Sequence, residues 1–227
     1  MNILKAVDLQ KIYGQGETEV RALDGVNFEV EKGEFVAIVG TSGSGKSTML
    51  HIIGGLDNPT SGKVIVDGQD LSHMTDEELT IFRRRNIGIV YQFYNLIPNL
   101  TVDENIMLPC LLDQRKPDAG KLERIVEMTG LSNRRKHLPG QLSGGQQQRV
   151  SVGRALINDP AFILADEPTG NLDSRSGREV IELLMAANRK SGQTLILITH
   201  DENIALQSNR ILTISDGRII RDEVIRG

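Results

Sequence analysis

The segment 40–48 constrains this chain more than any other part of its sequence. It reads G-T-S-G-S-G-K-S-T, and its first eight residues match the pattern G-x-x-x-x-G-K-[ST] in full. It follows the apolar run Phe35–Val39 and precedes a segment with helical character. Glycines here let backbone N–H groups turn inward, and a helix N-terminus carries a partial positive charge. The segment therefore predicts a loop that holds the phosphates of a nucleoside triphosphate.

Two side chains of this loop have roles that the pattern defines. Lys46 should reach the β- and γ-phosphates, and the Ser47 hydroxyl should ligate Mg²⁺. A flexible connecting loop is disfavoured by the strand–loop–helix context. A dinucleotide pattern starting at Gly43 fails because residue 48 is a threonine. The residues that we expect to bind the phosphates are Gly40, Thr41, Ser42, Gly43, Ser44, Gly45, Lys46, Ser47 and Thr48.

Composition argues against several other classes of protein. The chain has 227 residues, a net charge of −4, a single cysteine at Cys110, three Tyr, five Phe and no Trp. A negative chain with few aromatic residues is a poor nucleic-acid binder, so we expect no nucleic-acid partner. One cysteine excludes an internal disulfide framework. With no membrane-length apolar run and no secretory signal, we expect a cytosolic chain unless another protein holds it at a membrane.

The hydrophobic pattern predicts an α/β fold with a mostly parallel sheet. Phe35–Val39, Phe162–Ala165 and Thr194–Ile198 are apolar without alternation, which is typical of strands buried on both faces. Helical segments separate them. Further predictions are strands at 26–30, 63–66 and 87–91, a hairpin across 210–220, helices at 75–85, from 101, at 121–130, 143–158 and 177–190, and a surface loop at 117–120.

Polar residues follow two of the buried strands. Asp166 and Glu167 end the strand 162–165, and His200 comes two residues after Ile198. Ligands of parallel sheets bind beyond the carboxyl ends of the strands. Asp166 suits a Mg²⁺ held through water, Glu167 suits a base that polarises water, and His200 can hydrogen-bond the γ-phosphate. Without a Cys/His cluster a zinc site is not expected, and we assign surface or packing roles to His51, His73 and His137.

The run Leu142-Ser143-Gly144-Gly145-Gln146 resembles the signature motif of ATP-binding cassette (ABC) ATPases. Tyr13, Gln92, the pair 166–167, the segment 170–173 and His200 are placed like the other motifs of that family, in family order. The resemblance implies a P-loop NTPase with a mostly parallel core sheet, an N-terminal antiparallel β lobe and a helical lobe that carries the signature. The single domain 1–227 would divide into two lobes. Residues 1–91 and 160–227 would form the ATP-binding core with the β lobe, and residues 92–159 would form the helical lobe with the signature.

The same resemblance implies ATP and Mg²⁺ as cofactors and a second copy of the chain as partner. Tyr13 would stack on adenine, and Ser47, Gln92 and Asp166 would face the metal. Glu167 and His200 would be the catalytic pair. The signature residues Ser143, Gly144, Gly145 and Gln146 would bind the γ-phosphate held by the other copy, so that two ATP molecules lie between head-to-tail chains.

Two stretches, 91–105 and 165–173, resemble the branch of the family that contains macrolide exporters, lipoprotein extractors and antimicrobial-peptide pumps. This implies an integral membrane permease with a large extracytoplasmic domain and a peripheral place for this chain on the cytoplasmic face of the membrane. We interpret Phe93-Tyr94 and Leu96–Pro98 as a docking surface for the permease rather than a buried loop. The charge runs 83–85 and 134–136 are expected to be solvated.

Other functions are weighed against this interpretation. Cassette ATPases of DNA repair carry long coiled coils, for which the interval from Lys46 to Ser143 is too short. Ribosome-associated cassette proteins usually contain two cassettes. A non-transporting regulator, like the cell-division ATPase that signals through a similar permease, stays open. Use of GTP also stays open, because purine selectivity depends only on Tyr13. Gly153 stands where alanine is usual in the family.

Overall fold

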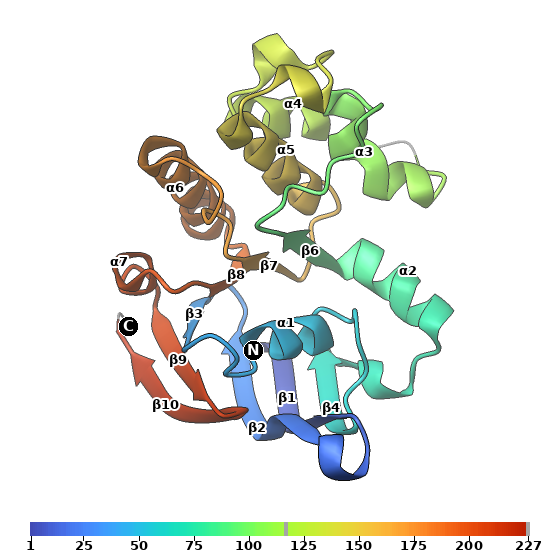
Figure 1. Cartoon of the computed structure of the whole chain (residues 1–227). Helices are drawn as coiled ribbons and strands as arrows, with labels where there is room; N and C mark the ends of the chain where they lie inside the picture. Colours follow the sequence, from blue (N-terminus) through green and yellow to red (C-terminus); the bar gives the residue numbers. More distant parts are fainter. Residues whose placement is uncertain (116–117, 226–227) are drawn as a thin grey trace.

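The computed structural model describes residues 1–115 and 118–225, which form two sheets and a helical lobe (Figure 1). The larger sheet has the strand order β10-β9-β3-β8-β7-β6, in which only β10 runs antiparallel to its neighbour. Its strands are β3 (Phe35–Val39), β6 (Ile87–Val90), β7 (Phe162–Asp166), β8 (Thr194–Ile198), β9 (Arg210–Ser215) and β10 (Arg218–Val224). The predicted mostly parallel sheet is confirmed.

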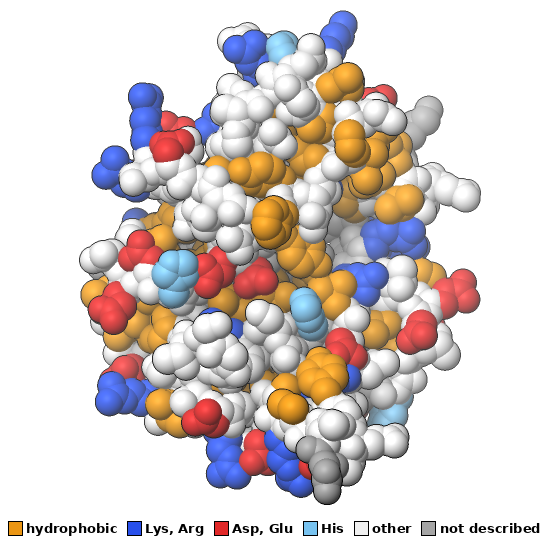
Figure 2. Space-filling view, viewed as in Figure 1, with side chains coloured by type: hydrophobic (Ala, Val, Ile, Leu, Met, Phe, Trp, Pro, Cys, Tyr) orange, Lys and Arg blue, Asp and Glu red, His pale blue; other side chains and the backbone are white. Residues whose placement is uncertain are grey.

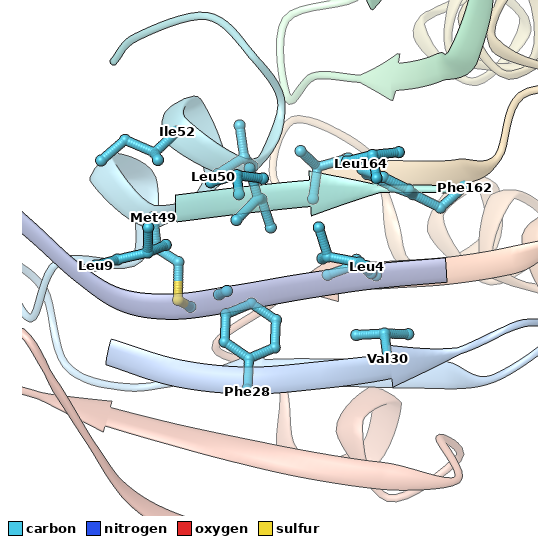
Figure 3. Packing of buried hydrophobic residues seen from close by; sticks show 14 of the residues in the cluster. Leu4, Leu9, Phe28, Val30, Met49, Leu50, Ile52, Phe162 and Leu164 are labelled. Atoms are coloured by element: carbon cyan, nitrogen blue, oxygen red, sulfur yellow. The ribbon is translucent and has the colours of Figure 1, made fainter. Parts of the chain in front are cut away.

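The second sheet is antiparallel and lies beneath the first (Figure 1). Its order is β2-β1-β4-β5, with β1 (Asn2–Tyr13), β2 (Val20–Glu31), β4 (Ser61–Val66) and β5 (Gln69–Asp70). Helix α1 (Lys46–Ile53) packs between the two sheets, where Met49 and Leu50 are fully buried (Figure 3). This layer is the predicted N-terminal β lobe, and it fixes the helix that follows the phosphate loop.

The remaining helices are α2 (Asp76–Asn86), α3 (Val102–Leu112), α4 (Ala119–Met128), α5 (Gly144–Leu156), α6 (Ser174–Ser191) and α7 (Glu202–Ala205), with short 3₁₀ turns at Gly16–Thr18, Leu71–His73, Ser132–Arg134 and Pro139–Gln141. Helices α3, α4 and α5 share their own apolar core, which includes Ile106, Val126 and Val150. They form the lobe at the top of Figure 1. A separate core on the sheet face under α6 includes Val180 and Leu184.

Helix starts follow the side-chain caps. The side chains of Thr75, Thr101 and Ser143 each accept the N–H of the third helical residue, and the side chain of that third residue accepts the backbone N–H of the capping residue. This reciprocal capping was predicted at Thr75 and Thr101. Helix α6 begins at Ser174 rather than near 177 because the Asp173 carboxylate accepts the N–H groups of Arg175 and Ser176.

The predicted loop 117–120 is wrong in its second half. Asp118 caps α4, so residues 119 and 120 are helical; residue 117 lies outside the described residues.

The run 83–85 is paired rather than solvated, which corrects the sequence interpretation. In the run 134–136, only Arg135 is in ion pairs with described residues, and Arg134 and Lys136 are exposed as expected. Arg83 donates to the Gly55 carbonyl at 2.6 Å, and Arg84 and Arg85 lie 2.8 and 2.7 Å from the Asp113 carboxylate. In the second run, Arg135 lies 3.0 Å from Asp103 and 2.5 Å from Glu123. These acidic partners lie far away in sequence, and only the fold of the helical lobe brings them close.

Candidate nucleotide-binding site

The phosphate loop joins β3 to α1 in a conformation that requires glycine. Gly45 has φ +105°, and a Cβ there would lie 2.4 Å from the Ala22 carbonyl oxygen. A Cβ on Gly40 would lie 2.3 Å from the Ile214 carbonyl oxygen. Backbone atoms of two other segments therefore fix the loop, and no side chain larger than hydrogen fits at either position.

Lys46 lies over its own loop. Its Nζ donates to the carbonyls of Gly40 at 2.9 Å and Thr41 at 2.7 Å. The Ser44 hydroxyl is buried without a hydrogen-bond partner among the described residues. The loop lines a pocket of about 380 Å³ together with Val20 and the turn at Gly217. A positive side chain beside inward-facing backbone suits a polyphosphate.

Tyr13 lies at the end of β1, opposite Val20 of that pocket in the strand register. The ring is 43% exposed. Its hydroxyl donates to Asp57 at 3.0 Å, and the Lys11 ammonium lies 5.1 Å from the ring centroid. Burial, together with the hydrogen bond to Asp57, raises the pKa of Tyr13. The ring is thus fixed at the pocket rim with a large part of its surface available for stacking.

The ends of β7 and β8 bring Glu167 and His200 together. Asp166 pairs with Ile198 in the sheet, and the Glu167 N–H donates to the Ile198 carbonyl at 3.0 Å. The His200 Nδ1 lies 2.5 Å from a carboxylate oxygen of Glu167. Glu167 has φ +46°, in the left-handed region that an L-residue rarely occupies. In Figure 2, acidic side chains and a histidine gather in the middle of this face.

The surroundings of Asp166 favour the neutral form of its carboxyl group. Burial, and then the nearby Glu167 carboxylate, raises its pKa, while His51 and Lys46 act in the opposite direction. His51 therefore does more than the surface or packing role expected from the sequence, because its ring lowers the pKa of Asp166.

Oxygen donors from Ser47, Asp166 and Gln92 are the type that Mg²⁺ prefers, with substrate phosphates completing its shell. Within the described residues, no group of three or more His, Cys, Asp and Glu side chains is placed to hold a metal.

Gln92 lies two residues beyond the end of β6, and its amide is held by the segment after Glu167. Its Nε2 donates to the Asn171 side chain at 3.2 Å, and the Asn171 Nδ2 donates back to the Gln92 carbonyl at 3.2 Å. A Cβ on Gly170 would lie 2.7 Å from the same Nε2. The glycine at 170 thus lets Gln92 pack against the loop that leaves the sheet beside the acidic pair.

The signature residues begin α5 in the helical lobe. Ser143 accepts the Gln146 N–H at 3.3 Å, and the Gln146 side chain accepts the Ser143 N–H at 2.9 Å. A Cβ on Gly144 would lie 2.7 Å from the Tyr94 hydroxyl, and one on Gly145 would lie 2.8 Å from Ser176. None of the signature residues lines the pocket of the phosphate loop.

The structure therefore brings together the phosphate loop, Asp166, Glu167 and His200, but leaves the signature apart. One connecting residue escaped the sequence analysis: Gln148 of α5 is fully buried and bonds to both sheet-end segments. The only sign of Gln148 in the sequence is that a polar residue stands at a buried position of the signature helix.

Comparison with known proteins defines the class. Residues 23–170 match the ABC transporter family. The lipoprotein-releasing system ATP-binding protein LolD of Geobacter metallireducens is 46% identical over 97% of this chain and 99% of its own. The macrolide export ATP-binding/permease protein MacB of Hyphomonas neptunium is 47% identical over 97% of this chain, which spans 34% of it.

A solved relative has the same fold over its whole length. The ATP-binding cassette MJ0796, seen as a dimer in a post-hydrolysis state with ADP and Pi, superposes with a TM-score of 0.88 at 45% identity, covering 99% of both chains. The chain belongs to the ABC transporter family. It is an ATP-binding cassette of that family, and hence an ATPase.

Proposed function

We propose that this chain is the ATP-hydrolysing subunit of a transporter with a separate membrane permease. The observation that carries the proposal is the contact between Glu167 and His200 at the edge of the sheet that holds the phosphate loop. Lys46 and the loop backbone hold the phosphates. Glu167, as base, takes the proton of the attacking water, and His200 orients that carboxylate and contacts the γ-phosphate.

The metal ligands that we propose are Ser47, Gln92 and Asp166. The bound Mg²⁺ would neutralise charge on the phosphates. The raised pKa of Asp166 supports this assignment, because a carboxylate short of positive charge gains most from a cation. Tyr13 would stack on the base, at the end of the pocket lined by Val20.

The second partner that we propose is another copy of this chain, arranged head to tail. The signature residues would present the N-terminus of α5 to the γ-phosphate held by the other copy. Two observations support this. The signature lies outside the phosphate-loop pocket of its own chain, and the cassette MJ0796 has been solved as a dimer. The lobes that we propose, 1–91 with 160–227 and 92–159, follow the separate core of the helical lobe.

A groove between α2 and α3 suits the cytoplasmic segment of the permease. Its volume is about 370 Å³, and none of the described residues that line it is acidic. Burial lowers the pKa of Arg154, whose guanidinium donates to the carbonyls of Tyr94 and Asn95. Phe93, which precedes Tyr94 in the chain, is 69% exposed. The groove thus fits an amphipathic segment with an acidic side chain; its lining includes Leu56, Arg83, Arg84, Leu108, Leu112 and Arg154.

The transported compound that we propose is hydrophobic or peptide-like, exported or extracted through a permease with a large extracytoplasmic domain. The names of the similar LolD and MacB proteins support this class.

No helix within residues 1–115 and 118–225 is long and apolar enough to span a membrane. This chain would then be peripheral, on the cytoplasmic face. A regulator that couples hydrolysis to an extracytoplasmic signal is the alternative.

The test is recovery of the partner from native cells. The tagged Glu167→Gln chain is captured in mild detergent with ATP, with Lys46→Ala as matched control. We expect a multi-span protein with a large extracytoplasmic domain, and its loss when Arg154 is replaced by Glu. Recovery of ribosomes or nucleic acid without a membrane protein would contradict the proposal. A permease whose deletion leaves export intact but disturbs cell-wall enzymes would favour the regulator.

A further inference from the structure

Gln148 is a buried amide that links three parts of the site. It belongs to α5, the helix that starts at the signature, and its side chain is fully buried. Its Nε2 donates to the Tyr91 carbonyl at 2.9 Å and to the Pro168 carbonyl at 2.8 Å. Its Oε1 has no hydrogen-bond partner among the described residues. One side chain therefore uses both of its donors outside its own lobe.

The two carbonyls are next to the residues that perform the reaction. Tyr91 immediately precedes Gln92, and Pro168 immediately follows Glu167. Because the proline ring fixes φ, holding the Pro168 carbonyl restricts the chain directly after Glu167. Glu167 is already in the left-handed region, and its carbonyl accepts the Gly170 N–H at 3.0 Å. A shift of Gln148 would therefore move the peptide group before Gln92 and the second peptide group after Glu167.

A second buried amide in the same lobe shows what is unusual about Gln148. Asn105 is also fully buried, but its Oδ1 accepts the Ile97 N–H and its Nδ2 donates to carbonyls of the segment 97–101. It thus fastens a loop to its own lobe and leaves no atom unpaired. Gln148 leaves a buried acceptor unpaired, which is unfavourable for stability. Its arrangement is better explained by the connection that it makes than by stability.

Arg154 also links α5 to a segment outside it, but to only one of the two segments that Gln148 joins. It lies further along α5 and donates to the Tyr94 and Asn95 carbonyls at 2.9 and 2.6 Å. These contacts reach the segment after Gln92 but not the segment after Glu167. Gln148 joins both segments to the signature helix at once.

We propose that Gln148 is a positioning residue that sets Gln92 and Glu167 relative to the signature helix. The inference rests on the proposed function, since it assumes that Glu167 activates water. Movement of the helical lobe then changes the geometry of hydrolysis through one amide. Gln148 lies outside the phosphate-loop pocket, so its loss should affect turnover and not ATP binding.

The test compares Gln148→Met with Gln147→Met. Methionine keeps the length of the side chain and removes both donors, leaving the two carbonyls free to shift. Gln147 precedes Gln148 on the same helix and donates only to Leu142 of its own lobe, at 3.2 Å. We expect kcat of Gln148→Met to fall about ten- to a hundredfold with KM for ATP within about twofold. Gln147→Met should stay within about twofold in both constants.

The experiment separates this inference from the proposed function. Glu167→Gln is assayed in parallel, and wild-type turnover in that variant would overturn the proposed function itself. If Glu167→Gln is inactive while folded Gln148→Met keeps wild-type kcat, only the positioning role is overturned.

Should Gln148→Met not fold, Gln148→Asn keeps an amide that is too short to reach both carbonyls, and the same loss of kcat is expected. Failure of both variants to fold would show that Gln148 is structural and would equally overturn the inference.

Discussion

The phosphate loop and the signature loop both place glycines at the start of a helix, but for different physical reasons. In the phosphate loop, Gly45 has φ +105° and its hydrogen faces a backbone carbonyl. In the signature, Gly144 and Gly145 belong to the regular helix α5, and a Cβ would strike the side chains of Tyr94 and Ser176. The first loop needs glycine both for a left-handed backbone and for the approach of another backbone segment, whereas the second needs it only so that neighbouring side chains can approach.

The two loops also differ in the parts of the molecule that they join. The phosphate loop bonds to itself through Lys46, and its helix α1 is fixed in the main core. The signature helix instead contacts the segment after β6 and the segment after β7. Changes in the phosphate loop should therefore abolish binding, whereas changes in the signature should affect communication between lobes.

The largest effect is expected from Lys46→Ala. The variant removes the ammonium that faces the phosphates and the two hydrogen bonds that hold the loop. Charge-assisted hydrogen bonds contribute about 1.5–3 kcal/mol each, so ATP affinity should fall about a hundredfold or more. Titration calorimetry measures it directly. Tight ATP binding by this variant would contradict the role of the loop.

A pair of alanine substitutions sharpens the comparison. Gly45→Ala should cost about 1–3 kcal/mol of stability and lose ATP binding, because both its φ and the Ala22 carbonyl oppose a Cβ. Gly144→Ala clashes only with the Tyr94 hydroxyl, so adding Tyr94→Phe should restore its free energy of unfolding. Denaturant unfolding of the single and double variants decides this. Equal behaviour of the two glycines, with no rescue by Tyr94→Phe, would remove the distinction.

A smaller effect is expected where the helical lobe is fastened to the core. The buried Asp113, just after α3, lies 2.7–2.8 Å from Arg84, Arg85 and Arg115. Burial raises the pKa of Asp113, but the Arg85 hydrogen bond and the neighbouring guanidinium charges lower it by more. A lowered pKa stabilises the folded state above the ordinary aspartate value of 3.8, and this stability is lost as pH falls below it.

Asp113→Asn should therefore cost about 1–2 kcal/mol at neutral pH, because Arg85 and Arg115 are half exposed. The difference from wild type should shrink below pH 4 or so. Urea unfolding at several pH values measures both quantities. A difference that does not change with pH would show that the charge of Asp113 is not responsible.

The sequence anticipated the parts of the structure that depend on local chemistry. The capped helix starts at Thr75 and Thr101, the buried strands, and the closeness of the strand ends that carry Asp166 and His200 follow from pattern and from the geometry of parallel sheets. Long-range pairing was not accessible. Asp113 gave no local sign that it would bind Arg84 and Arg85, and Gln148 gave no sign of the two carbonyls that it would join.

The central claim is that the phosphate loop of one chain and the signature of another complete one ATP site. The most direct test is the mass of the Glu167→Gln chain, by light scattering, with and without ATP. We expect the 25.0 kDa monomer without nucleotide and a dimer with ATP. Adding Ser143→Arg should keep ATP binding and abolish the dimer. A normal ATP-dependent dimer of the Ser143→Arg, Glu167→Gln chain would contradict the claim.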